Sequence, residues 1–149
     1  MTSRGYEVRA LLDVNVLIAL LDADHIHHVR ARDWLGANIA TGWASCPITQ
    51  NGCIRILSQP NYPNALKPSE VAERLREATE AVFHQFWAES PSLLSPGLVS
   101  WEYIVGSRQV SDAYLLALAV RHDGRLVTFD HAIATGVVMG AEERHLVVL

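Results

Sequence analysis

Three aspartates occupy comparable places in this sequence, and carboxylates placed in this way can bind a divalent cation. Asp13 and Asp130 each follow a short apolar run with the composition of a strand, and each is expected to open a helix. Asp112 stands in the expected first turn of a helix over residues 110–120, which carries no further charge. In an open parallel sheet, the carboxyl ends of the strands and the N-termini of the following helices share one edge, where ligands bind. We therefore expect the three carboxylates to lie in one region.

Each aspartate alone has a simpler interpretation, because Asp is a favoured N-cap and negative charge is stabilised in the first turn of a helix. Three at one edge are different, because carboxylates within about 4–6 Å of each other repel and their pKa values rise unless a cation neutralises them. Oxygen ligands without Cys or His favour Mg²⁺ or Mn²⁺ over zinc. Such an ion can activate a water for in-line attack on a phosphodiester. Asp13, Asp112 and Asp130 are thus the candidate catalytic and metal-binding residues.

Other chemistries fit the sequence less well. We find no Ser-His-Asp or Cys-His set, no Walker loop and no Gly-x-Gly-x-x-Gly. A phosphatase of the haloacid-dehalogenase kind would use the aspartate after the first strand as its nucleophile. Such enzymes resemble Asp-x-Asp-x-Thr there, and in this chain Asn15 stands in place of the second acid. His25, His27 and His28 have no nearby Cys, and we interpret them as a solvated segment rather than a metal site.

The composition is that of a folded, mildly acidic protein. Half of the 149 residues are hydrophobic, so we expect one packed domain over residues 1–149. The 12 Lys and Arg against 16 Asp and Glu give a net charge of −4, which argues against nonspecific coating of nucleic acid but does not exclude a nuclease. Cys46 and Cys53 are expected to be small buried side chains. Signal-peptide features are lacking and the apolar run 10–21 is too short to span a membrane, so we expect a cytoplasmic protein.

Apolar runs alternate with segments of helical spacing along the chain. This alternation predicts an α/β fold of three layers, α/β/α, with a mainly parallel central sheet. Strands are expected over residues 8–12, 42–46, 125–129 and 145–149, and near Phe86–Trp87. Helices are expected over residues 14–21, 25–35, 47–57 and 110–120, with a further helix capped by Ser69 and a short one after Pro96.

Three segments stand out together: Leu-Leu-Asp-Val-Asn-Val-Leu-Ile-Ala-Leu-Leu-Asp at 11–22, Gln-Val-Ser-Asp-Ala-Tyr-Leu-Leu-Ala-Leu-Ala at 109–119 and Leu-Val-Thr-Phe-Asp at 126–130. In this order they resemble the signature segments of PIN-domain proteins, most closely those of the VapC-type toxins of bacterial toxin–antitoxin pairs. The resemblance covers nearly the whole chain, and it implies a PIN-like fold. It implies an endoribonuclease that hydrolyses RNA, often transfer or ribosomal RNA, by a metal-activated water. It also implies a homodimer and a cognate antitoxin that blocks the site.

The resemblance implies a role for each matching residue. Asp13, Asp112 and Asp130 match the acidic residues of the family. Asn15 and Thr128 stand where small polar residues support the site.

One position departs from the family pattern. The helix after the second strand usually carries a glutamate, and Gln50 replaces it. We expect Gln50 to be a third supporting residue, since its amide oxygen can still serve a metal-bound water although it brings no negative charge. We expect an active site with three carboxylates and weaker metal affinity. The alternative is a PIN-like domain that has lost catalysis and binds RNA or a protein.

Arg55 and Arg108 are candidates for phosphate contacts near the acidic edge, because a guanidinium suits phosphate.

Overall fold

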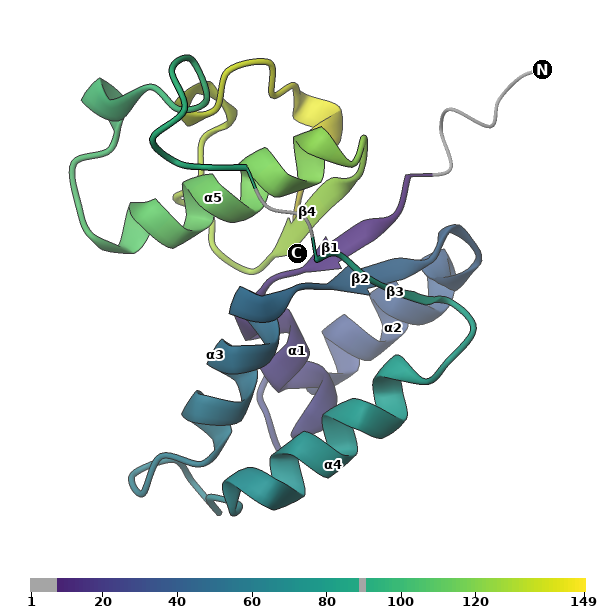
Figure 1. The fold of residues 1–149 in the computed structure, drawn as a ribbon. Helices are drawn as coiled ribbons and strands as arrows, with labels where there is room; N and C mark the ends of the chain where they lie inside the picture. Colours follow the sequence, from purple (N-terminus) through teal and green to yellow (C-terminus); the bar gives the residue numbers. More distant parts are fainter. Residues whose placement is uncertain (1–7, 89–90) are drawn as a thin grey trace.

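A computed structural model describes residues 8–88 and 91–149 of the chain. At its centre lies a five-stranded sheet in which all neighbouring strands pair in parallel, in the order β3-β2-β1-β4-β5 (Figure 1). The strands are β1 (Ala10–Leu12), β2 (Trp43–Ser45), β3 (His84–Phe86), β4 (Arg125–Thr128) and β5 (Leu146–Val148). The predicted α/β fold with a parallel sheet is confirmed.

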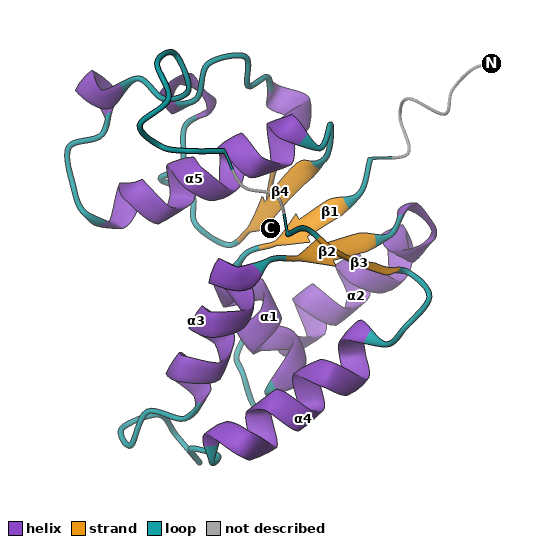
Figure 2. Ribbon diagram, viewed as in Figure 1, coloured by secondary structure: helices purple, strands orange, loops and turns teal. Residues whose placement is uncertain are grey.

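Helices cover both faces of the sheet and make the three predicted layers (Figure 2). The helices are α1 (Val14–Leu21), α2 (His28–Asn38), α3 (Pro47–Leu57), α4 (Pro68–Thr79) and α5 (Arg108–Arg121). Helices α1 to α4 lie on one face and α5 lies on the other. Each face has its own cluster of buried apolar side chains. Among the described helices, none is long and apolar enough to cross a membrane.

The central strand β1 contributes to both hydrophobic clusters. Leu11 packs into the cluster beside α5, and Leu12 packs into the cluster beneath α1 to α4. Both side chains are fully buried. A parallel strand buried on both faces is apolar throughout instead of alternating with polar residues. The first polar residue, Asp13, therefore falls where the strand leaves the sheet.

Helix α5 is buried on nearly every side because loops cover the face that points away from the sheet. All seven residues 113–119 are buried. The cluster on this face includes Val99 from the loop before α5, and Val137 and Val138 from the loop after β4. Val99 and Val138 also form an antiparallel bridge that joins the two loops. The uncharged stretch of the helix is thus explained by apolar neighbours on both sides.

The start of α4 and the short helix expected after Pro96 differ from the prediction. Helix α4 begins at Pro68 and Ser69 lies inside it, because proline suits the first helical position. Glu70 accepts a hydrogen bond from the backbone of the capping residue at 3.2 Å and takes the capping role expected of Ser69. The short helix expected after Pro96 is a series of turns, followed by a 3₁₀ turn at Trp101–Tyr103.

Two further corrections concern the acidic residues. Helix α5 begins at Arg108, so Asp112 lies in its second turn. The Gln109 side chain accepts hydrogen bonds from two backbone N–H groups before the helix, at 2.7 and 2.9 Å, and starts the helix earlier than expected. Asp130 is followed by a turn instead of a helix, because its own Oδ1 accepts the backbone N–H of Ala132 at 2.8 Å.

Gly124 lies where no larger side chain fits. A Cβ atom at this position would stand 2.7 Å from Cη2 of Trp87 and 2.8 Å from the carbonyl oxygen of Arg9. We expect Gly124→Ala to lower the free energy of unfolding by about 1–3 kcal/mol, because a ring and a backbone segment must both move. Urea unfolding followed by far-UV circular dichroism measures this loss.

Gly36→Ala is the matched control for this substitution. Gly36 is exposed in α2, and its Cβ would meet no atom within 4 Å. Alanine favours the helix there, so this variant should gain up to about 1 kcal/mol. If the Gly124→Ala protein is as stable as the Gly36→Ala protein, the close approach of Trp87 and Arg9 to Gly124 does not exclude a larger side chain.

Candidate acidic active site

Asp13 is held by hydrogen bonds at the junction of β1 and α1. Its Oδ1 accepts the backbone N–H of Val14 at 2.7 Å, and its Oδ2 accepts the hydroxyl of Thr128 at 2.7 Å. Only 7% of the residue is exposed. Burial raises the pKa of Asp13, the hydrogen bonds from Thr128 and Val14 oppose that rise, and the charge of Asp130 adds to it. The carboxylate is therefore fixed in orientation but poorly solvated.

Thr128 and Asn15 connect Asp13 to the end of β4. The Thr128 hydroxyl oxygen accepts the backbone N–H of Asp130 at 3.0 Å and the Asn15 amide at 3.3 Å. The Asn15 oxygen accepts the backbone N–H of Phe129 at 3.3 Å. The structure thus places Asn15 and Thr128, two of the three predicted supporting residues, between Asp13 and Asp130.

Asp112 approaches the other two carboxylates from α5. Its pKa is raised to about 6, first by burial and then by the charges of Asp13 and Asp130. A hydrogen bond between the carboxyl groups of Asp112 and Asp130 adds to the rise. The fold therefore brings the three predicted acidic residues together from distant parts of the chain.

The donor chemistry of this group fits a divalent cation. In the described ranges, 8–88 and 91–149, no three His, Cys, Asp or Glu side chains already stand in an arrangement that could hold a metal ion. Burial raises the pKa of Asp112 most, and the charges of Asp13 and Asp130 nevertheless add to that rise by repulsion. A dication relieves such repulsion, and carboxylate oxygens are ligands that Mg²⁺ and Mn²⁺ prefer.

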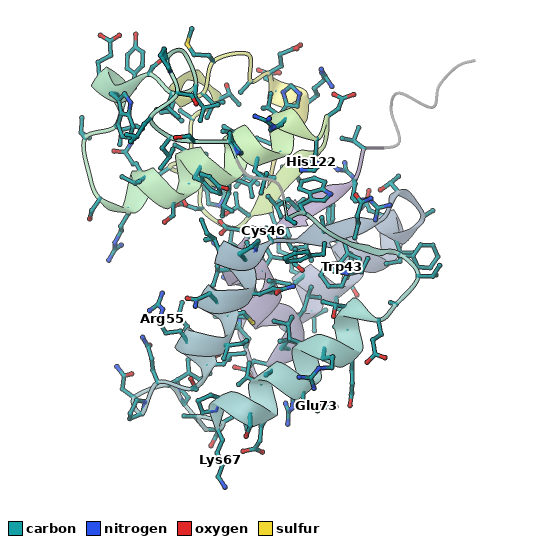
Figure 3. The ribbon with its side chains drawn as sticks, in the orientation of Figure 1. Trp43, Cys46, Arg55, Lys67, Glu73 and His122 are labelled. Carbon is teal, nitrogen blue, oxygen red and sulfur yellow. The ribbon has the colours of Figure 1, made fainter. Side chains whose placement is uncertain are left out.

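A cavity of about 490 Å³ opens beside Asp13 between α3 and α5. Its walls are Asp13, Val14, Pro47, Ile48, Asn51, Gly52, Arg55, Ile56, Ser111 and Leu115. Arg55 is exposed on α3, where Figure 3 shows its side chain extending away from the helix. Gln50 takes a different direction, since its amide nitrogen donates to the Ser45 hydroxyl at 3.0 Å. Asn51, which the sequence analysis did not single out, lines the cavity instead.

A second cavity, of about 200 Å³, lies on the other side of the acidic residues. Asp112 and Asp130 line it together with Arg108. The first turns of α5 separate the two cavities, with Ser111 facing the larger and Arg108 facing the smaller. The two predicted arginines therefore flank the carboxylates from opposite sides.

The remaining candidates lie outside this group. The exposed His27 ring stacks on Phe129 with ring centroids 4.7 Å apart, and His28 bonds to the Ala19 carbonyl oxygen at 2.7 Å. Cys46 and Cys53 are buried, as predicted. Sequence reasoning missed Ser45 and His84, whose side chains bond to each other at 2.8 Å. No spacing signal in the sequence relates these two residues.

The raised pKa of Asp112 links this residue to stability. The unfolded carboxyl titrates near 3.8 and the folded one near 6, so the free energy of unfolding falls as pH rises between these values. Above them, the charged Asp112 destabilises the fold. Without divalent cations, we expect Asp112→Asn to be more stable than the wild type at about pH 7.5 by about 1–2 kcal/mol, a value reduced for solvent screening.

Urea unfolding at about pH 7.5 and about pH 4 measures this difference, which should shrink at the lower pH. Asp33→Asn, at an exposed carboxylate in α2, serves as the control. A lower stability of Asp112→Asn than of the wild type at the higher pH would contradict the repulsion.

Comparison with known proteins agrees with this architecture. The PIN domain family model matches residues 10–135. Ribonuclease VapC44 of Mycobacterium tuberculosis (strain H37Rv) is 51% identical over 142 residues, which are 95% of this chain and 100% of that protein. Ribonucleases VapC38 and VapC29 of the same strain are 46% and 44% identical, each over 128 residues, covering 85% and 83% of this chain and 88% and 87% of their own lengths. The chain therefore belongs to the PIN-domain family, and within it the predicted likeness to VapC proteins is confirmed.

Proposed function

We propose that this protein is a metal-dependent endoribonuclease, a toxin of the VapC type. The observation that carries the proposal is the meeting of Asp13, Asp112 and Asp130 at the carboxyl ends of β1 and β4, with the pKa of Asp112 raised to about 6. The relatives named as ribonucleases support RNA as the substrate.

Asp13, Asp112 and Asp130 would hold Mg²⁺ or Mn²⁺. A bound cation of this kind lowers the pKa of water and offsets negative charge on the leaving oxygen. The protein itself supplies the orientation. Hydrogen bonds from Val14 and Thr128 hold both oxygens of Asp13 in place, so little reorganisation of this carboxylate accompanies the reaction.

Asp112 and Asp130 share a hydrogen bond that needs a proton on one of them. Cation binding replaces this proton, because metal ligands must be ionised. Metal affinity should therefore fall as pH decreases toward the pKa of Asp112, which is about 6. We expect the protein to bind its cation best at neutral or alkaline pH.

Membership in the PIN-domain family, with relatives named VapC, supports further parts of the proposal. A cognate antitoxin protein blocks the site, and the toxin acts in the cytoplasm as a homodimer. Its substrate is structured RNA, such as transfer or ribosomal RNA.

Asp13→Asn should abolish RNA cleavage while the protein stays folded, because it removes one carboxylate charge at the most constrained position. Total bacterial RNA is incubated with purified protein in Mg²⁺, Mn²⁺ or chelator, and the products are separated by electrophoresis. Discrete fragments should appear only with the wild type and only with a cation. Asp24→Asn, at an exposed position, should cleave like the wild type.

The alternative of an inactive binding domain is tested in the same assay. Gln50→Ala should cleave about tenfold more slowly than the wild type but retain metal-dependent activity, because the three carboxylates remain. Full activity of Asp13→Asn would refute the assigned site. Folded, antitoxin-free wild-type protein that cleaves no RNA with either cation would establish the binding domain instead.

Arg55 should contribute to RNA binding and not to the chemical step. It lines the cavity beside Asp13, and neither Arg55 nor Arg108 takes part in an ion pair among the described residues. We expect Arg55→Ala to raise KM about tenfold with little change in kcat, since it removes a charged hydrogen bond to phosphate.

Steady-state cleavage of a fluorescent oligonucleotide measures both constants. Arg121→Ala, an exposed arginine at the far end of α5, is the matched control and should change neither. Equal effects of the two substitutions would show that Arg55 acts only through the general charge of the surface.

A further inference from the structure

A chain of polar side chains connects α3 to the strands β2 and β3. The Gln50 amide nitrogen donates to the Ser45 hydroxyl oxygen at 3.0 Å, and this hydroxyl bonds to Nε2 of His84 at 2.8 Å. Ser45 is fully buried. His84 also hydrogen bonds to the backbone of Thr79 at the end of α4. Consecutive hydrogen bonds thus join four elements in the order α3, β2, β3 and α4.

The direction of each hydrogen bond follows from the groups involved. An amide nitrogen only donates, so Ser45 accepts from Gln50. The single hydroxyl proton of Ser45 is then directed to Nε2 of His84, which must be unprotonated to accept it. A neutral imidazole then carries its proton on the remaining ring nitrogen, Nδ1, which leaves Nδ1 as the donor for the hydrogen bond between His84 and the Thr79 backbone. The chain therefore requires a neutral His84 in one defined tautomer.

The surroundings of His84 also disfavour its charged form. Burial lowers its pKa most, and the positive charge of Arg9 lowers it further, while the Thr79 bond opposes the change. Arg9 is held close by, since its guanidinium donates to the Phe83 carbonyl oxygen at 2.8 Å. The Trp43 ring, labelled in Figure 3, lies 4.4 Å from the imidazole between ring centroids.

We propose that Ser45 and neutral His84 are positioning residues that fix the Gln50 amide, and that the charge of residue 50 sets the protonation state of His84. Gln50 lies in the first turns of α3, and the same helix presents Asn51 and Arg55 to the cavity beside Asp13. This series of hydrogen bonds thereby connects the wall of that cavity to β2 and β3. The effect that we expect on RNA cleavage rests on the proposed ribonuclease function.

A glutamate at position 50 would reverse the direction of these hydrogen bonds. A carboxylate only accepts hydrogen bonds, so the Ser45 hydroxyl would donate to it. The Ser45 oxygen would then accept from His84, whose Nε2 must carry a proton. With Nδ1 keeping the proton that it has in the wild type, His84 would become an imidazolium. Gln50 and a neutral His84 are therefore a matched pair.

The protonation of His84 is measured by NMR on the full chain. Long-range ¹H–¹⁵N correlation spectra identify the tautomer, a pH titration gives the pKa, and loss of the signal in His84→Gln assigns it. In the wild type we expect a proton on Nδ1 and a pKa below 6.5. In Gln50→Glu the pKa should rise by about one unit or more. Asn51→Asp puts the same charge on the next residue, which takes no part in this series of hydrogen bonds, and should shift the pKa of His84 far less.

A proton on Nε2 in the wild type, or equal shifts in Gln50→Glu and Asn51→Asp, would overturn the proposal. In the cleavage assay, Ser45→Ala should reduce kcat about as much as Gln50→Ala does. Unchanged cleavage by Ser45→Ala would overturn the positioning role even where NMR finds the expected tautomer. A wild type that cleaves no RNA would overturn the proposed function instead, and the NMR measurement would still decide the hydrogen-bond chain.

Discussion

The burial and crowding of three carboxylates are the constraint around which the rest of this structure is arranged. The parallel register pairs Leu12 with Val127, so the chain leaves β1 and β4 at the same level of the sheet and Asp13 lies close to Asp130. Asp112 cannot move away, because residues 113–119 of its helix are buried between the sheet and the covering loops. The raised pKa of Asp112 expresses the cost of this arrangement. The large core beside α5 offsets that cost.

Neutral groups keep the crowded carboxylates in place. Asp13 is bonded to a backbone N–H and to the Thr128 hydroxyl, and no Lys or Arg forms an ion pair with it among the described residues. A cationic partner would stabilise Asp13 but would also compete with a bound metal ion. Hydrogen bonds from uncharged groups orient the carboxylate and leave its negative charge available. Thr128 and Asn15 suit this role because both are short, polar and neutral.

The sequence predicts the features that depend on a local pattern of residues. It does not predict those that depend on contacts between distant segments. Apolar strands that end in aspartate predicted β1, β4 and the edge where Asp13 and Asp130 meet. The start of α5 was misplaced because Gln109 caps the preceding backbone with its side chain, which no apolar period reveals. The bond between Ser45 and His84 joins residues 39 positions apart, and only the pairing of β2 with β3 brings them together.

We expect the glutamine at position 50 to shift the balance between folding and cation binding. A carboxylate at position 50, in the helix that follows β2 at the same edge of the sheet, would add negative charge there, which disfavours the metal-free fold and attracts a dication. Gln50 does neither, and its amide is satisfied by Ser45 without a buried charge. By this reasoning, the metal-free protein should be more stable, and the proposed cation should be bound less tightly, than with glutamate at this position. Because the three aspartates that would hold the cation are all retained, we expect glutamine at position 50 to weaken affinity for the ion without removing the proposed site.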